Sequence, residues 1–303
     1  MAWSEELKTR FQDRCLFSAP LARYTTFHIG GGAESLVFPV SEEDWTWLLG
    51  FVRRCGLPLT VLGLGANVIV SDSGLPGVTA STRRMSGFAV SDSRVSAQAG
   101  AVLDAVVART VETGLAGMEK LSGIPGTVGG ALWINAGAFG QETYERLLCF
   151  TALDREGRLV RRAKAEARYG YRKVEGNDGL VFLSAQWELA PGDQGLLREA
   201  RAATLRARAD KQPLDLPSAG SVFKRPPGDY ASRLIDSCGL KGLTVGCAQI
   251  SPKHAGFIVN LGGATARDVM ALISQVREAV LAKTGVRLEL EQVPLGFSSE
   301  EAA

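Results

Sequence analysis

The segment Pro217–Lys224 places the hydroxyl of Ser221 directly after a glycine and three residues before the ammonium group of Lys224. A hydroxyl on a flexible turn beside a cation can serve as a nucleophile or as a proton donor. Proline, serine and glycine also form ordinary bends, and the next two residues could simply begin a strand. The segment alone leaves both interpretations open, so the rest of the chain has to decide between them.

The histidines and cysteines exclude several kinds of chemistry. Only His28 and His254 are present, and the five cysteines show no CxxC spacing, so the sequence predicts no metal site. It contains no G-x-S-x-G motif, and neither histidine can be assigned to a Ser-His-Asp triad from spacing. Hydrolase chemistry is therefore not supported. The odd number of cysteines is typical of reduced thiols and predicts a cytoplasmic protein.

Length and charge limit the possible partners. The chain has 303 residues, enough for two or three domains. Its 34 Lys and Arg residues nearly balance 32 Asp and Glu residues, for a net charge of +2, which gives no general reason to expect nucleic acid. The chain starts with no basic region followed by an apolar one, and it contains no apolar run of roughly 20 residues. We therefore expect a soluble protein with no membrane insertion.

Two glycine-rich segments could approach a phosphate. The first, 63–68, follows a predicted strand at 59–62, but Val68 stands where a dinucleotide motif needs its third glycine, and no helical pattern follows. Its glycines could form a phosphate-binding nest or a plain hairpin. The second, 122–131, has four glycines, a proline and two hydroxyls, and 135–140 extends it with room for a flat ring. These residues favour a nucleotide cofactor over tight packing.

Hydrophobic periodicity and capping signals predict the elements that position these segments. Pro213 and Pro217 mark the start of a final domain, in which Thr265 begins a helix through a capping box with Asp268. The basic helix at 196–211 is expected to present a solvated charged face. The other predictions are helices at 43–54 and 103–113, an antiparallel region at 150–187 with a turn at 154–157, and a buried apolar stripe at Val269, Leu272, Ile273, Val276 and Val280.

Taken in order, these motifs resemble the UDP-N-acetylenolpyruvoylglucosamine reductase family of cell-wall synthesis across nearly the whole chain. The matching segments are 24–31, 62–67, 123–130, 135–140, 171–172, 219–224, 253–255 and 288–291. The resemblance implies an α+β protein with a two-subdomain FAD-binding fold of the vanillyl-alcohol-oxidase-like type and a C-terminal α+β substrate-binding domain. The expected FAD subdomains are 1–80 and 81–211. The expected substrate domain is 212–303, whose last strand returns Glu291 to the flavin.

The resemblance also implies the cofactors and the residues that hold them. FAD would be bound noncovalently and NADPH would be the electron donor. The expected FAD-binding residues are Gly63, Gly65, Ala66, Asn67, Ser122, Gly123, Pro125, Gly126, Thr127, Gly129, Gly130, Asn135, Gly137 and Ala138.

The implied reaction reduces UDP-N-acetylglucosamine enolpyruvate to UDP-N-acetylmuramate in peptidoglycan precursor synthesis, and so serves cell-wall biogenesis, cell shape and cell division. Hydride would reach C3 of the enolpyruvyl group, and Ser221 would supply a proton to C2. Arg172 and Glu291 match the family positions that stabilise the enol-like intermediate. The expected substrate-binding residues are Tyr171, Lys211, Lys224, Arg225 and His254. We expect the enzyme to be a monomer.

Structural alternatives stand beside these roles. Arg172 could be a surface arginine paired with Glu166 or Glu175, Glu291 could face water, and His254 could be a structural histidine. The chain also departs from the family pattern. Ala66 replaces a serine, Arg225 replaces an asparagine, the segment after Arg172 is altered, and Gln292 replaces a β-branched residue. The chain resembles the shorter members of the family, which lack a tyrosine-bearing loop that is inserted in the longer ones.

Two other functions remain open at this point. One is an FAD-dependent oxidase that acts on a sugar or alcohol through the same flavin fold. The other is a non-catalytic protein that binds a nucleotide sugar, which the altered positions Ala66 and Arg225 suggest. A visible spectrum followed by anaerobic additions of NADPH and substrate would separate the three hypotheses.

Overall fold

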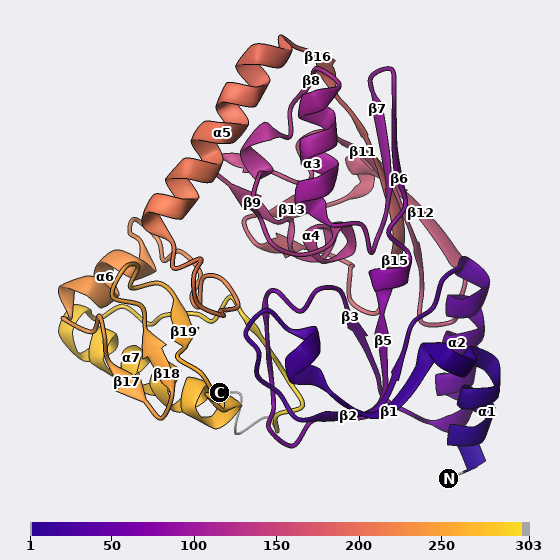
Figure 1. Ribbon diagram of the computed structural model, residues 1–303, viewed down its shortest axis with the longest axis horizontal. Coiled ribbons are helices and arrows are strands. Elements are labelled where there is room, and N and C mark those ends of the chain that lie inside the picture. Colours follow the sequence, from indigo (N-terminus) through magenta and orange to yellow (C-terminus); the bar gives the residue numbers. More distant parts are fainter. Residues whose placement is uncertain (1, 299–303) are drawn as a thin grey trace. The chain divides into compact units, whose positions relative to one another are not determined.

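The computed structural model describes residues 2–298, and the chain divides into two compact units, each built from several segments (Figure 1). Unit 1 comprises Met1–Phe17, Ser35–Leu64 and Gly77–Arg208, within the described residues. Unit 2 comprises Ser18–Glu34, Gly65–Pro76 and Ala209–Ala303, again within the described residues. Among residues 2–298, no helix is both long and apolar enough to cross a membrane.

The N-terminal part of unit 1 packs helices α1 (Ala2–Phe11) and α2 (Glu42–Cys55) around a shared core. The Ser41 hydroxyl caps α2 by accepting a hydrogen bond from the Asp44 amide. Strand β3 (Leu59–Leu62) follows and pairs in parallel with β5 (Leu75–Ser81). The helix and strand predicted here are confirmed. The sheet order is β1 (Cys15–Pro20), β2 (Gly32–Val37), β5 and β3.

A five-stranded antiparallel sheet forms the larger core of unit 1 and confirms the predicted antiparallel region. Its order is β12 (Leu159–Ala163), β11 (Leu147–Leu153), β15 (Val181–Glu188), β7 (Arg94–Gln98) and β6 (Phe88–Ser91). Helices α3 (Leu103–Glu112) and α4 (Val128–Ile134) pack against it (Figure 1). Trp187 and Phe150 are fully buried between these layers, so the helices that carry the glycine-rich loop rest on a rigid sheet.

Helix α5 (Gln194–Lys211) is present as predicted, but its basic face is only partly solvated. Arg198 and Arg206 are exposed. Arg208, in contrast, is only 7% exposed, and Arg201 forms an ion pair with Asp104 on α3. The expectation of a wholly solvated face is therefore wrong, because the helix packs beside other unit 1 residues that the charge pattern alone does not reveal.

Unit 2 packs helices α6 (Ala231–Ser237) and α7 (Ala266–Thr284) with a three-stranded antiparallel sheet (Figure 1). The sheet order is β17 (Thr244–Val245), β18 (Ala248–Ile250) and β19 (Ile258–Asn260). All five predicted stripe residues of α7 are at most 1% exposed, and the capping box at Thr265 is present. Strand β20 (Val293–Leu295) pairs in parallel with β4 (Val68–Val70).

Short elements connect these layers. They are the 3₁₀ helices Gln12–Arg14, Leu21–Tyr24, Thr82–Arg84, Glu119–Leu121 and Lys164–Glu166, and the strands β8 (Leu115–Ala116), β9 (Gly137–Ala138), β10 (Gln141–Glu142), β13 (Tyr169–Gly170), β14 (Lys173–Val174) and β16 (Ala190–Pro191).

The first turn of α7 is held by a carboxylate from a distant part of unit 2. The Oδ1 atom of Asp72 accepts from the Ala266 amide at 2.8 Å, and Oδ2 accepts from the Arg267 amide at 3.0 Å. The first amides of a helix have no partner within the helix, and a carboxylate there also complements the helix dipole. Asp72 therefore ties the loop after β4 to the main helix of unit 2.

We predict that Asp72→Ala lowers the free energy of unfolding by about 1–2 kcal/mol, because two helix amides lose their acceptor. Asp72→Asn should recover part of this loss, since its amide oxygen still accepts a hydrogen bond. Urea denaturation of the three proteins measures the difference. An alanine variant as stable as the native protein would contradict this role for Asp72.

Candidate active site

The predicted site residues fall into two groups, one in each unit. Unit 1 holds the second glycine-rich loop and the arginine candidate: Gly63, Ser122, Gly123, Pro125, Gly126, Thr127, Gly129, Gly130, Asn135, Gly137, Ala138, Tyr171 and Arg172. Unit 2 holds the serine and glutamate candidates with the remaining cations: Gly65, Ala66, Asn67, Lys211, Ser221, Lys224, Arg225, His254 and Glu291.

In unit 2, the backbone brings Ser221 beside Glu291. The Val222 carbonyl accepts from the Glu291 amide at 2.8 Å, and the Lys224 amide donates to the carbonyl of Glu289 at 2.8 Å. Ser221 itself forms a bridge with Phe257 on its other side. Both candidate residues are half-buried. A hydroxyl and a carboxylate from segments about 70 residues apart thus lie on paired stretches of extended chain.

The turn before Ser221 is held through each of its four carbonyl oxygens. The Asn260 amide donates to Pro217 at 2.9 Å, and the Thr26 hydroxyl donates to Ser218 at 2.7 Å. The carbonyls of Ala219 and Gly220 both accept from one side-chain amide, described below. Gly220 has a φ of +75°, a left-handed conformation that favours glycine.

The first glycine-rich segment joins this group. The side-chain amide of Asn67 donates to the Glu291 carbonyl at 3.1 Å, and the Asn67 carbonyl accepts from Val293 at 2.9 Å. The Gly65 carbonyl accepts from the Thr26 amide at 3.1 Å. No helix follows this segment, which agrees with the exclusion of a dinucleotide motif. Asn67 therefore helps to place the backbone of Glu291, a function that the sequence did not indicate.

Two of the unit 2 cations, Lys224 and Arg225, contact side chains nearby. The Lys224 ammonium lies 3.4 Å from a carboxylate oxygen of Glu289, and the Arg225 guanidinium lies 4.5 Å from the ring centroid of Tyr230. The ammonium of Lys224 is thus directed toward Glu289, whereas the sequence interpretation placed it beside the Ser221 hydroxyl.

The fold fixes the orientation of the His254 ring, and nearby positive charges affect its pKa. Its Nδ1 accepts from the Gly256 amide at 3.1 Å, and its ring meets Phe257 edge-on. Burial lowers the pKa of His254 below its usual value, and the positive charges of Lys241 and Lys211 lower it further. Neutral His254 therefore carries its proton on Nε2, where it can donate a hydrogen bond. Lys211 is exposed.

In unit 1, the half-buried carboxylate of Asp104 anchors the second glycine-rich loop. Oδ1 of Asp104 accepts from the Gly123 amide at 2.7 Å, and both carboxylate oxygens accept from Arg201 at 2.6 and 2.9 Å. Burial opposes ionisation of Asp104. The hydrogen bonds from Arg201 and Gly123, with the charges of Arg201 and Arg208, outweigh burial and hold the pKa of Asp104 below its usual value.

The hydroxyls of this loop serve the fold. Ser122 Oγ donates to the Glu119 carbonyl at 2.5 Å, and Thr127 Oγ1 accepts from the Gly130 amide at 3.3 Å as the N-cap of α4. Both side chains are buried. A phosphate at this loop would accordingly meet mainly its backbone, around the half-buried Gly126 and the exposed Gly130.

Arg172 lies beside the second part of the glycine-rich surface. Its Nη2 donates to the Gly137 carbonyl at 2.7 Å, and its guanidinium lies 4.9 Å from the ring centroid of Tyr171. Arg172 has a φ of +52°, which is uncommon for a residue other than glycine. The carboxylate of Glu175 lies instead near Arg168, at 3.9 Å. The arginine is thus held at the edge of the strand that begins with Gly137.

The buried side chain of Asn135 supports the glycine-rich surface at 135–140. It is fully buried, and its side-chain nitrogen donates to Glu142 at 2.7 Å and to the Gly170 carbonyl at 3.2 Å. Its side-chain oxygen accepts from the Tyr144 amide at 3.1 Å. These bonds fix the chain on both sides of Gly137 to the strand that precedes Tyr171.

A diphosphate fits the charge of this region. The buried side chain of Arg208 lies directly beneath Gly123, since a Cβ on that glycine would fall 2.8 Å from Arg208 Cδ. Burial lowers the pKa of Arg208, and the charge of Arg172 adds to this effect. Two guanidinium groups next to a loop with little side-chain bulk provide a setting for an anion.

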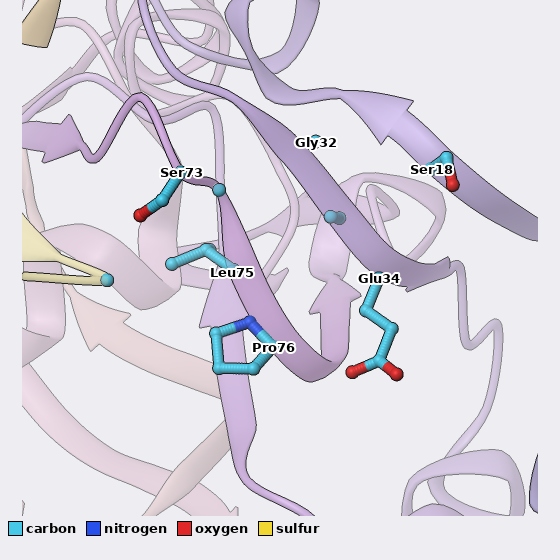
Figure 2. A pocket seen from close by; sticks show the side chains of 9 residues that line it. Ser18, Gly32, Glu34, Ser73, Leu75 and Pro76 are labelled. Carbon is cyan, nitrogen blue, oxygen red and sulfur yellow. The ribbon is translucent and has the colours of Figure 1, made fainter.

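A separate pocket in unit 2 contains none of the predicted residues. It has a volume of about 480 Å³ and is lined by Ser18, Gly32, Ala33, Glu34, Ser73, Gly74, Leu75, Pro76 and Gly296. Figure 2 shows the carboxylate of Glu34 and the hydroxyl of Ser73 at its edge. Its lining lacks a cation, so it offers no match for the phosphates of a nucleotide.

Three supporting residues escaped the sequence interpretation. Asp104 looked like any carboxylate in the first turn of a helix, and Arg208 looked like part of a solvated face. Gln292 was noticed only as a departure from the family pattern, although its side chain is the one that holds the carbonyls of Ala219 and Gly220. Each acts through a contact distant in sequence, for which the chain carries no local signal.

Known protein families match both the N-terminal and the C-terminal part of the chain. The C-terminal domain of UDP-N-acetylenolpyruvoylglucosamine reductase matches residues 212–294, and an FAD-binding domain matches residues 33–162. UDP-N-acetylenolpyruvoylglucosamine reductase of Alkalilimnicola ehrlichii is 45% identical over 89% of this chain and 90% of its own. The enzyme of Moorella thermoacetica is 41% identical over 96% of both chains.

A solved structure agrees with these relatives. The crystal structure of UDP-N-acetylenolpyruvylglucosamine reductase from Thermus caldophilus superimposes with a TM-score of 0.80 at 34% identity, covering 93% of this chain and 98% of that one. The expected fold class is therefore confirmed. The chain has an FAD-binding domain followed by the C-terminal domain of this reductase, and it contains both helices and strands throughout.

We predict that Asp104→Asn destabilises the protein by about 1–3 kcal/mol at pH 7, because the amide keeps an acceptor for Gly123 but loses the charged hydrogen bonds to Arg201. The folded pKa of Asp104 is depressed, so its contribution is present above the unfolded value of about 3.9 and is lost as pH falls through the folded pKa. Urea denaturation between pH 3 and pH 7 should show the two proteins converging at the acidic end. A constant difference across this range would contradict the prediction.

Proposed function

The chain belongs to the UDP-N-acetylenolpyruvoylglucosamine reductase family, and from this premise we propose how its residues carry out the reaction. It is an FAD-dependent oxidoreductase that reduces the enolpyruvyl group of UDP-N-acetylenolpyruvoylglucosamine. The observation that carries the proposal is the placement of Ser221 beside Glu291 on paired segments of unit 2.

The FAD would be held by backbone rather than by charged side chains alone. The loop around Gly126 and Gly130, the surface at 135–138 and the segment 65–67 present little side-chain bulk, and Arg208 adds charge beneath the loop. We propose that these residues bind the cofactor, with 1–80 and 81–211 as its subdomains and 212–303 as the substrate domain. When bound, FAD supplies the means to take a hydride from NADPH and pass it to C3 of the substrate.

The overall reaction balances with one external proton. NADPH, a proton and the enolpyruvyl ether give NADP⁺ and the lactyl ether, so the carbon–carbon double bond gains a hydride at C3 and a proton at C2. Ser221 supplies the proton at C2, and its hydroxyl is restored from solvent. The half-buried position of Ser221 on a turn held through four carbonyls suits a donor that must keep one direction.

Arg172 and Glu291 act on the charge that develops as hydride arrives. Negative charge grows at C2 and on the adjoining carboxylate, where a guanidinium stabilises it. One pair of unit charges 4 Å apart is worth about 4 kcal/mol at an effective dielectric of 20. The hydrogen bond from Arg172 to the Gly137 carbonyl fixes the orientation of the guanidinium group. Glu291 lies on the segment that pairs with the segment of Ser221, and it polarises the enol-like intermediate.

The substrate's diphosphate and sugar meet the remaining polar residues. Lys211 and Arg225 provide positive charge for the diphosphate, and His254 Nε2 provides a hydrogen-bond donor. We propose Tyr171 and Lys224 as further substrate-binding residues. We further propose that the enzyme works as a cytoplasmic monomer in peptidoglycan precursor synthesis, and so supports cell-wall biogenesis, cell shape and division.

Two anaerobic half-reactions test the proposal. NADPH should bleach the visible flavin spectrum of the purified protein, and the UDP-enolpyruvyl sugar should then restore it with formation of the lactyl ether. A flavin that free sugars bleach and oxygen restores, but that the UDP-enolpyruvyl sugar does not reoxidise, would contradict the proposed substrate. A colourless protein that binds the UDP-sugar would contradict the redox reaction.

We predict that Ser221→Ala slows substrate-dependent reoxidation by roughly 10² to 10⁴-fold, the range for loss of a general acid. Reduction by NADPH should be unchanged, because no proton to C2 is needed in that step. Stopped-flow absorbance of both half-reactions measures the two effects separately. Ser237→Ala is the matched control, since Ser237 donates only to Leu234 within α6. Near-native reoxidation by Ser221→Ala would remove Ser221 from this role.

A further inference from the structure

The side chain of Gln292 forms two hydrogen bonds to the turn that precedes Ser221. It is 2% exposed, and its Nε2 donates to the carbonyls of Ala219 and Gly220, both at 3.1 Å. The orientation of the amide is dictated by chemistry, since exchanging its nitrogen and oxygen would set Oε1 against two carbonyl oxygens. Both hydrogen atoms of one NH₂ group are thus directed at successive peptide units.

Those two peptide units determine where Ser221 points. A peptide group is planar, so fixing the Gly220 carbonyl also fixes the amide nitrogen of Ser221. Side-chain packing does not restrain Gly220 itself, because a Cβ placed on it would meet only the Ala66 carbonyl oxygen, 4.0 Å away. Glycine at a φ of +75° has a wide range of alternative conformations. The amide of Gln292 supplies the restraint that side-chain packing does not.

The backbone of the same residue reaches the other side of Ser221. The Val222 carbonyl accepts from the Glu291 amide at 2.8 Å and from the Gln292 amide at 3.4 Å. Gln292 therefore contacts the chain both before and after the serine, and it directly follows the glutamate of the same site. A valine or isoleucine side chain at this position could fill the space but could not donate to either carbonyl.

We propose that Gln292 is a positioning residue for proton delivery: its amide holds the Ala219–Gly220 turn so that the Ser221 hydroxyl points at C2 of the substrate. The inference rests on the proposed function, because it assigns Gln292 a role through Ser221 in the second half-reaction. Small displacements of a reacting group carry large costs, since a misplacement of about 1 Å can slow a reaction roughly 10²-fold.

The first test compares Gln292→Met with the native holoenzyme. Methionine fills a similar volume without a donor. We expect reoxidation by the UDP-enolpyruvyl sugar to slow by roughly 10 to 100-fold, while substrate affinity and reduction by NADPH stay within about 2-fold. The solvent deuterium isotope effect on reoxidation should rise, because proton transfer becomes more rate-limiting. A native reoxidation rate and isotope effect would overturn the proposal.

A double-mutant cycle with Ser221→Ala asks whether Gln292 acts through the serine. If it does, Gln292→Met should add less than about 3-fold to the defect of Ser221→Ala, because the positioned group is already gone. A full multiplicative loss would overturn the proposal and assign Gln292 a role independent of Ser221.

Asn177→Leu is the matched control for a purely structural loss. Asn177 is also 2% exposed, and its Nδ2 bridges two carbonyls, those of Leu132 and Trp133, at 3.3 and 3.4 Å in unit 1. This variant removes a buried amide that donates to two carbonyls, as Gln292→Met does, but it should leave the isotope effect at its native value. An equal rise of the isotope effect in both variants would show a general consequence of destabilisation and overturn the proposal.

Gln292→Glu keeps the proposal testable if the methionine variant does not fold. A carboxylate opposes both carbonyl oxygens, whereas a protonated carboxyl can donate to one of them. Reoxidation by this variant, relative to the native enzyme, should therefore recover at least about 3-fold between pH 8 and pH 5.5, since burial raises the pKa of such a group. A ratio independent of pH, or failure of both variants to fold, would overturn the proposal.

The native protein separates this inference from the proposed function. If native flavin is not restored by the UDP-enolpyruvyl sugar, the proposed function fails and the role of Gln292 fails with it. If native turnover is normal and the Gln292 variants match it, only the positioning role is overturned.

Discussion

The pairing of 222–224 with 289–291 is the interaction on which the chemistry of unit 2 depends. Its two hydrogen bonds of 2.8 Å, from the Glu291 and Lys224 amides, join segments separated by the whole of α6, the three-stranded sheet and α7. Closing so long a loop costs conformational entropy. Burial of the apolar stripe of α7 against that sheet offsets the cost. The site is therefore maintained by a core that contains none of its reactive groups.

In unit 1, the glycine-rich loop at 122–131 keeps one conformation beside the buried guanidinium group of Arg208. Asp104 and Arg208 both lose hydration on burial, but only Asp104 gains enough from hydrogen bonds to favour its charged form. Arg208 remains a desolvated cation next to Gly123 and within the influence of Arg172. An arginine has no accessible neutral form near pH 7. The region therefore favours an anionic ligand, and Asp104 fixes the loop that would meet it.

Local signals in the sequence predicted the elements but not the contacts between them. Helix α7 followed from its capping box and apolar period, because both lie within one element. Helix α4 was missed, since two glycines follow its N-cap and glycine disfavours helices. The structure accommodates them because Gly129 packs closely against Ala99, where a Cβ would lie 3.0 Å from the Ala99 Cβ. The candidate residues came from family motifs, whereas the bonds of Asp104, Asn67 and Gln292 that hold them depend on tertiary packing.

Gln292 shows why stability alone does not explain a buried amide. Its Oε1 is buried without a hydrogen-bond partner among residues 2–298, and such a group costs about 1–3 kcal/mol. Its two hydrogen bonds to carbonyls contribute roughly 0.5–1.5 kcal/mol each, so the sum is near zero. An apolar side chain would leave the carbonyls of Ala219 and Gly220 without this donor but would bury no unpaired oxygen. The amide therefore adds little to stability. Its effect is to select one orientation of the Ser221 peptide group from those that Gly220 permits.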